Sequence, residues 1–383
     1  MFGQIVILLL IQVGGLGIVT IMSGLMLLLN RKMGIGDRLL IQDAFNLNTM
    51  AGLAKFVKNV LFGTLIIEGA GAVLYMLVFV PEFGAKGVWI SLFNSISAFC
   101  NAGIDIIAEN SLCNYATHPL VNAVTSALIV LGGLGYIVWW DVLRVIKSRT
   151  PSNRKIFRHL TLHSKIAITA TIGLIFVGAA LILIFEYDNP LTIGEMPLLD
   201  KIQVSLFQSV TTRTAGFASV PQENLTNASA AVSVILMLIG GSPVGTAGGM
   251  KTVTVAVLIS SALATIRNKN SATLFGRRIS EGSVKKAVAV AVTFLAICTA
   301  ATVLLMATSN ASVIDAVYET VSATATVGLS RNLTSTLNVF GKIIIIVTMY
   351  FGRVGPISLA VALGSKNESQ NVISEPTEEI SIG

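Results

Sequence analysis

Ser322-Ala323-Thr324-Ala325-Thr326-Val327-Gly328-Leu329-Ser330 is the stretch on which the expected fold rests. It follows a short segment with helix-forming potential, 312–320, and lies between two long apolar segments. A Thr-Val-Gly loop can line an ion path with backbone carbonyl oxygens, which replace the hydration shell of a cation. One such tripeptide occurs often by chance, so its weight depends on whether the chain repeats the arrangement.

The composition of the chain is that of a membrane protein. Hydrophobic residues make up 54% of the 383 residues and charged residues 12%, with a mean hydropathy of +0.80. A soluble domain carries about 25% charged residues, so we expect a polytopic membrane protein and not a soluble enzyme. No metal-ligand spacing, redox spacing or catalytic pair is found among the six Cys and His residues Cys100, Cys113, Cys298, His118, His159 and His163.

The arrangement around Gly328 recurs twice upstream. Half-length apolar segments at 88–100 and 199–212 lead into Asn101-Ala102-Gly103 and Thr214-Ala215-Gly216. Gly103 and Gly216 are 113 residues apart, and Gly216 and Gly328 are 112 apart. Membrane loops rarely keep such a constant spacing by accident, so we infer an internal repeat of span, half-helix, loop and span.

The repeat predicts an all-α fold with seven spans and three pore half-helices around one pseudo-four-fold pore. The predicted spans are 1–29, 60–80, 120–142, 166–185, 228–266 (broken in its middle), 287–307 and 339–363. The predicted units are 1–58 (the second span of an incomplete first repeat with its cytoplasmic loop), 59–165, 166–286, 287–364 and the cytoplasmic tail 365–383.

The first unit is expected to be incomplete. Gly14-Gly15-Leu16-Gly17 matches Gly132-Gly133-Leu134-Gly135. By the same offset the loop glycine of the first unit would precede Met1. We therefore expect a first span, half-helix and filter loop to be missing.

The basic residues predict the orientation. Of the 26 Lys and Arg residues, 18 lie in the loops 30–58, 144–165 and 267–286. In the predicted topology these three loops are on the same side of the membrane. Basic loops face the cytoplasm, so the glycine loops face outside. This asymmetry and contact with lipid account for the net charge of +7 without nucleic acid. Docking of an acidic cytosolic partner stays open.

The three loops are predicted to form an ion filter. Non-helical backbone at membrane depth is tolerated only when it is buried or lines a water-filled path. The negative C-terminal ends of the half-helices would point at a cation. A divalent ion would call for carboxylates, so we expect a monovalent one. The predicted filter residues are Asn101, Ala102, Gly103, Thr214, Ala215, Gly216, Thr326, Val327 and Gly328. The alternative is that these glycines serve helix packing.

A second predicted feature is an intramembrane gate. The segment 240–252 holds five glycines and Pro243, which make a continuous helix costly. The alternatives are a kinked helix whose lysine snorkels toward the interface and an arginine that binds helix-end carbonyls. The predicted gate residues are Gly240, Gly241, Gly245, Gly248, Gly249, Lys251 and Arg353.

Together these motifs resemble the Trk/Ktr/HKT superfamily of potassium transporters, and most of all its Ktr-type membrane subunit, over essentially the whole chain. The resemblance rests on the segments 97–103, 211–217, 240–252, 322–330, 351–355 and 378–383. It implies four repeats, one pore per subunit, a homodimer and potassium uptake that is coupled to sodium (symport) or promoted by it. It also implies a loop gate that Arg353 helps to close.

The resemblance also implies a cytosolic nucleotide-binding regulator ring as partner. The nucleotide would bind to that partner, and no cofactor is expected in this chain. The expected location is the bacterial plasma membrane, with the C-terminus in the cytoplasm. Two other functions stay open: a truncated, non-conducting interaction subunit of the same family, and a repeat-built transporter of another small solute.

Overall fold

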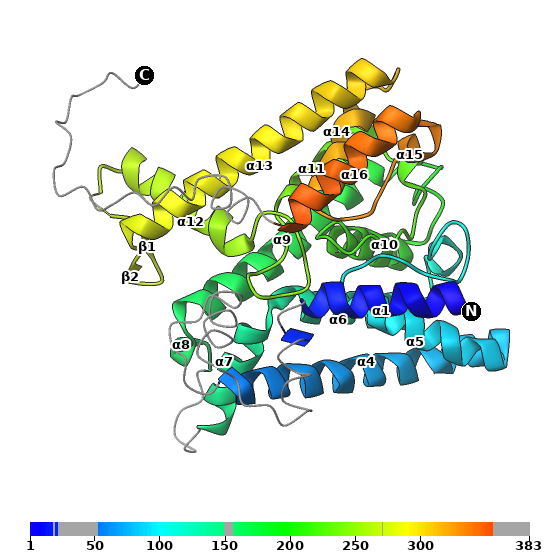
Figure 1. Cartoon of the computed structure of the whole chain (residues 1–383), viewed down its shortest axis with the longest axis horizontal. Coiled ribbons are helices and arrows are strands. Elements are labelled where there is room, and N and C mark those ends of the chain that lie inside the picture. Colours follow the sequence, from blue (N-terminus) through cyan, green and yellow to red (C-terminus); the bar gives the residue numbers. More distant parts are fainter. Residues whose placement is uncertain (18–19, 22–52, 149–155, 270, 355–383) are drawn as a thin grey trace.

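The structure is a computed structural model that describes residues 1–17, 20–21, 53–148, 156–269 and 271–354 (Figure 1). The predicted tail 365–383, most of the first basic loop and the ends of the first and last predicted spans lie outside the described residues.

Long apolar helices begin the three units that were predicted as complete repeats, which are named here the second, third and fourth repeats. They are α4 (Leu53–Phe83), α9 (Leu162–Glu186) and α13 (Glu281–Thr308). Among the described helices, these three are long and apolar enough to cross a membrane, and a fourth span results if one bent helix pair is counted. About 20 residues cross the hydrocarbon core, so the chain is a multi-pass membrane protein. Pro81 does not end α4, because in the last turn its missing N–H costs only one helix bond; α4 ends before Gly84.

A shorter helix follows each long one. These helices are α5 (Ala85–Phe99), α10 (Leu198–Thr211) and α14 (Val313–Thr324). Each packs against the long helix of its own repeat, and α5 also packs against α1 (Phe2–Leu16) (Figure 1). The C-terminal halves of all three are almost entirely buried, although they carry many Ser, Thr and Asn residues.

The helices after the glycine loops differ from the prediction. The expected continuous span 120–142 is wrong: α6 (Pro119–Leu134) bends by 92° into α7 (Tyr136–Lys147). The break is at Gly135, whose φ of 85° favours glycine. Gly17, after α1, has nearly the same backbone angles. The apolar run continues through Gly135, so hydropathy alone does not show the bend.

The predicted break in the third repeat is present. α11 (Asn227–Leu238) and α12 (Thr252–Ile266) are separated by residues 239–251, named here the central loop. In the fourth repeat α16 (Val339–Val354) packs against α13 and α14. The remaining elements are η1 (Cys113–Tyr115), α8 (Ile156–His159), η2 (Gln222–Asn224) and α15 (Leu333–Thr336).

One basic loop contains a small hairpin that the all-α prediction missed. β1 (Thr273–Leu274) pairs antiparallel with β2 (Arg277–Arg278). The two turn residues, Phe275 and Gly276, both have positive φ, as in the two-residue turns that match strand twist. Strands of two residues leave too short an alternating pattern to be detected in a sequence.

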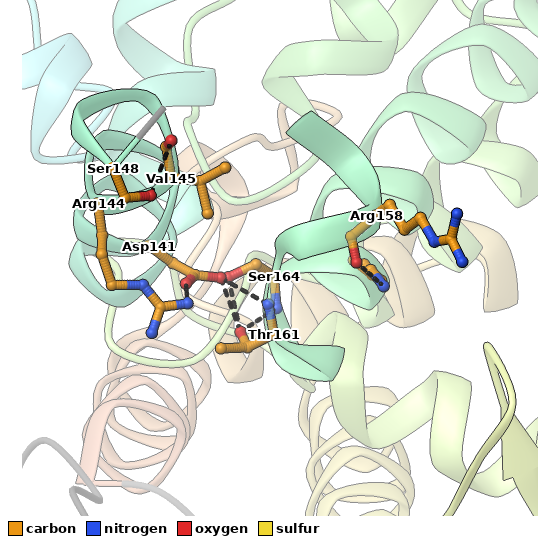
Figure 2. A network of polar contacts seen from close by, with 8 residues as sticks. Asp141, Arg144, Val145, Ser148, Arg158, Thr161 and Ser164 are labelled. Atoms are coloured by element: carbon orange, nitrogen blue, oxygen red, sulfur yellow. Dashed lines mark hydrogen bonds and ion pairs between the residues drawn. The ribbon is translucent and has the colours of Figure 1, made fainter. Parts of the chain in front are cut away.

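A buried carboxylate joins the second repeat to the third (Figure 2). Asp141 of α7 accepts a hydrogen bond from Arg144 at 2.6 Å. It accepts two more from the backbone N–H and the hydroxyl of Thr161, at 2.8 and 2.9 Å. The Thr161 hydroxyl in turn accepts from the Ser164 N–H and caps α9. Asp141 therefore fixes the start of α9 against α7.

We predict that Asp141→Ala lowers the free energy of unfolding by about 1–3 kcal/mol, because it leaves the partly buried Thr161 donors without their acceptor. The matched control is Arg144→Ala. The Arg144 side chain is 62% exposed, so its loss should cost less than about 1 kcal/mol. The measurement is the apparent melting temperature in detergent by tryptophan fluorescence. Equal shifts for both variants would contradict this role of Asp141.

Candidate functional site

The three predicted filter segments have the same backbone conformation. In each of the glycine loops 101–103, 214–216 and 326–328, the first and third residues lie in the left-handed region. A non-glycine residue with positive φ is uncommon, so its recurrence at equivalent positions indicates a shared local structure. The φ values are 52° and 67° for Asn101 and Gly103, 71° and 87° for Thr214 and Gly216, and 54° and 96° for Thr326 and Gly328.

The glycine loops meet at one place. A Cβ atom added to Gly103 would clash with the Ala215 carbonyl oxygen and lie 2.6 Å from the Cα of Gly216. A Cβ atom added to Gly216 would clash with the Val327 carbonyl oxygen. The third-repeat loop therefore touches both of the others. Gly103 and Gly216 are required both by their positive φ and by this close backbone approach.

Hydroxyl groups near the C-terminal ends of α5, α10 and α14 form hydrogen bonds with the loops that follow these helices. The Ser97 hydroxyl accepts from the Ile104 N–H at 3.0 Å, and the Ser322 hydroxyl accepts from the Gly328 N–H at 3.2 Å. In the third repeat the Thr211 hydroxyl donates to the Phe217 carbonyl at 2.6 Å. The sequence reasoning missed these residues. Their signal is the distance of six residues from Ser97 to Gly103 and again from Ser322 to Gly328.

The central loop lies directly against the glycine loops. Its two ends are joined, because Gly240 donates its N–H to the Met250 carbonyl at 2.9 Å. Gly248, which lies beside Gly240, donates its N–H to the Thr214 hydroxyl at 3.0 Å. A Cβ atom on Gly248 would lie 2.5 Å from the Ala325 carbonyl oxygen, next to the fourth-repeat loop. The structure thus brings the residues predicted as gate and as filter together.

Basic side chains bind the carbonyl groups of the central loop. Lys251 donates to the Ala247 carbonyl at 2.6 Å. Arg353 donates to the Thr246 carbonyl at 3.3 Å and also to the Gly14 carbonyl near the end of α1. Lys251 points back into its own loop, so the snorkelling alternative does not describe it. Arg353 contacts both a helix-end carbonyl and the predicted gate.

A cavity of about 780 Å³ lies beside the glycine loops. The second-repeat and fourth-repeat loops line it, together with α1 and α16, whereas the third-repeat loop does not. Thr214 and Ala215 are fully buried. The cavity lining is largely apolar, with Glu319, Ser330 and Arg353 among its polar members.

Isolated acidic side chains flank the loops: Glu68 contacts Cys100, and Glu319 lines the cavity. Asp105 follows the second-repeat loop, and burial raises the pKa of its carboxyl group, while bonds from Ser111 and from the backbone of Ile107 and Ala108 oppose that rise. In the part of the chain that the structure describes, no group of three or more His, Cys, Asp or Glu side chains could hold a metal ion. The converging groups are therefore backbone carbonyls and hydroxyls.

The fold and this site define a multi-pass membrane protein with repeated loops that meet between its helices. Residues 1–375 match the family described as "Cation transport protein" (TrkH). The chain belongs to the TrkH family of cation transport proteins, whose members are transporters rather than enzymes.

Named relatives match the whole chain. It is 37% identical to the "Ktr system potassium uptake protein B" of Bacillus subtilis over 383 residues, which cover 100% of this chain and 83% of the relative. It is 36% identical to the "Potassium/sodium uptake protein NtpJ" of Enterococcus hirae, again over 100% of this chain and 83% of the relative.

A solved structure has the same fold. The potassium transporter TrkH from Vibrio parahaemolyticus matches with a TM-score of 0.71 and 17% identity, over 93% of this chain and 71% of that one. The resemblance inferred from the sequence motifs is confirmed by these comparisons.

We predict that Gly216→Ala destabilises the protein by about 2–4 kcal/mol, because it combines overpacking against Val327 with a strained positive φ. The matched control is Gly69→Ala in α4, where an added Cβ meets nothing within 4 Å. That change should be neutral or slightly stabilising. The measurement is again the apparent melting temperature. If Gly216→Ala melts like the control, the loops do not meet as described.

Proposed function

We propose that the protein is a potassium-uptake subunit in which a monovalent cation passes through a filter of backbone carbonyls at the three glycine loops. The observation that carries this proposal is the contact of the third-repeat loop with both others. Glycine at these contacts allows carbonyl-bearing backbone from three repeats to approach one point. Relatives named as potassium uptake and potassium/sodium uptake proteins support the choice of ion.

The proposed pore has pseudo-four-fold symmetry. Three sides are formed by the glycine loops, and the fourth faces the cavity between α1 and α16. That cavity borders the second-repeat and fourth-repeat loops, so a fourth half-helix and loop of the same kind would complete the ring there. The glycine loops themselves offer backbone carbonyls and no carboxylate side chain, and this favours a weakly hydrated monovalent cation.

The central loop is the proposed gate. Its Gly248 contacts the glycine loops of two repeats, and Arg353 binds its Thr246 carbonyl. In this proposal the loop obstructs the ion path below the filter, and Arg353 and Lys251 hold it there. Movement of the loop would then open the path.

The remaining proposals concern partners and setting. We place the protein in a bacterial plasma membrane, with the basic loops and the C-terminus in the cytoplasm. Sodium-promoted uptake, a homodimer and a cytosolic nucleotide-binding regulator ring are proposed from the Ktr-type resemblance. Relatives named as parts of a "Ktr system" support a multi-component assembly.

The test of function is rubidium uptake by bacteria that lack their own potassium systems and carry a Ktr-type regulator. The chain is expressed alone and with a first unit donated by a relative. We expect uptake in at least one of these two forms. If neither form takes up rubidium although both reach the membrane, the potassium proposal is wrong.

We predict that Gly328→Asp lowers rubidium uptake at least about tenfold, because the fourth-repeat loop gains a side chain at a φ of 96°. The matched control is Gly276→Asp, since Gly276 also has positive φ but lies in the β1–β2 turn, with nothing within 4 Å of an added Cβ. Equal uptake by the two variants would argue against a filter at Gly328.

We predict that deletion of residues 245–249 raises rubidium uptake, because it removes Gly248 and the neighbouring residues, which lie against the glycine loops. Uptake is measured per molecule in the membrane. Combining the deletion with Gly328→Asp should abolish the gain if the ions still pass the filter. A well-expressed deletion variant with slower uptake would count against a gate.

A further inference from the structure

A buried arginine next to the third-repeat glycine loop has no part in the function proposed so far. Arg213 directly precedes Thr214, and only 6% of it is exposed. No described acidic side chain forms an ion pair with it. Burial of a charged group is costly unless the group is paired or fully hydrogen-bonded, so a buried arginine without an acid needs another explanation.

Two hydrogen bonds of Arg213 compensate part of this cost. Its guanidinium donates to the Gly240 carbonyl at 3.0 Å and, more weakly, to the Thr171 hydroxyl of α9 at 3.4 Å. Its Nε has no partner. Gly240 lies at the beginning of the central loop, where its N–H is bound to the Met250 carbonyl at the loop's other end. Arg213 therefore binds the point at which the loop is closed.

The next residue binds the other strand of the same loop. The Thr214 hydroxyl accepts from the Gly248 N–H, and Gly248 lies beside Gly240, where the two ends of the loop meet. Two consecutive side chains of the third repeat thus hold both chain segments at the base of the central loop. At the equivalent positions the other repeats carry Cys100 and Ala325, which have no cationic side chain. This connection is specific to the repeat that also contains the loop.

We propose that Arg213 is a positioning residue that anchors the base of the central loop to the third-repeat glycine loop, so that the two segments move together. The inference rests on the proposed function for its effect on transport, but not for the anchoring itself. In that function, displacement of Thr214 or of the loop would be transmitted through the Arg213–Gly240 bond.

The test measures how often the loop opens, independently of transport. Ala247 is 2% exposed, so Ala247→Cys places a protected thiol in the loop. Its rate of labelling by a small thiol reagent is measured by peptide mass spectrometry in the full chain in detergent. The native Cys298 of α13, also buried, serves as internal control in every sample.

We predict that Arg213→Met raises the labelling rate at position 247 about tenfold, the change expected when one hydrogen bond to a charged group is lost. Labelling of Cys298 should stay unchanged. Arg213→Lys, which keeps one donor, should give an intermediate rate. Thr171→Val, which removes only the weaker contact, should label like the parent protein.

Two results would overturn the anchoring. One is an unchanged rate at position 247 in Arg213→Met. The other is an equal rise at Cys298, which would show general loosening. If Arg213→Met does not fold, Arg213→Lys decides by the same comparison.

Rubidium uptake then separates this inference from the proposed gate. Faster labelling together with faster uptake supports both. Faster labelling with unchanged uptake leaves the anchoring intact and removes the gate.

Discussion

The constraint on which this structure depends is that backbone N–H and C=O groups outside helices must find hydrogen-bond partners within the protein when their surroundings are apolar. An unpaired backbone group in the bilayer core costs several kcal/mol. The three glycine loops and the central loop nevertheless place non-helical backbone between membrane helices. Serine and threonine side chains at the ends of α5, α10 and α14 meet part of this requirement, as in the bond from the Ile104 N–H to Ser97.

The same constraint explains why the loops pack against one another. Gly248 of the central loop donates its N–H to the Thr214 hydroxyl, and the Thr246 hydroxyl donates to the Phe99 carbonyl at 2.9 Å. The N–H of Ser242 finds the Gly133 carbonyl, left free where α6 bends. Backbone groups that are left unpaired where a helix is interrupted in one repeat thus form hydrogen bonds with such groups in another repeat. A change in one loop therefore alters the hydrogen bonding of its neighbours.

Much of this arrangement could be predicted from the sequence, because its signals are local or periodic. The half-helices follow from short apolar segments before loops, and the equivalence of Gly103, Gly216 and Gly328 follows from their spacing. The central loop follows from its glycines and Pro243. The bend at Gly135 could not be predicted from hydropathy, since apolar residues continue on both sides of it. The sequence match between Gly17 and Gly135 shows that the two glycines are equivalent, but it does not indicate the 92° bend between α6 and α7.

Contacts between distant segments could not be predicted. Arg213 and Gly240 are separated by 27 residues and by the whole of α11. The sequence showed Arg213 only as part of a motif, with nothing to indicate which carbonyl it would bind. Likewise, the clash that a Cβ on Gly216 would make with Val327 depends on how the third and fourth repeats pack. Such contacts depend on how the helices pack in three dimensions. The pattern of residues along the chain does not show which residues will meet.

The basic residues around the central loop have a consequence for a cation on the proposed path. Arg213, Lys251 and Arg353 each donate to a carbonyl oxygen of this loop. At the glycine loops, by contrast, no described hydrogen bond joins a Lys or Arg side chain to a carbonyl of the three segments. In the proposed filter the carbonyl oxygens would coordinate the cation, whereas in the central loop carbonyl oxygens are occupied by Lys and Arg side chains. Because charges repel strongly where water is excluded, a loop held in this way would oppose a passing cation by its charge as well as by its bulk.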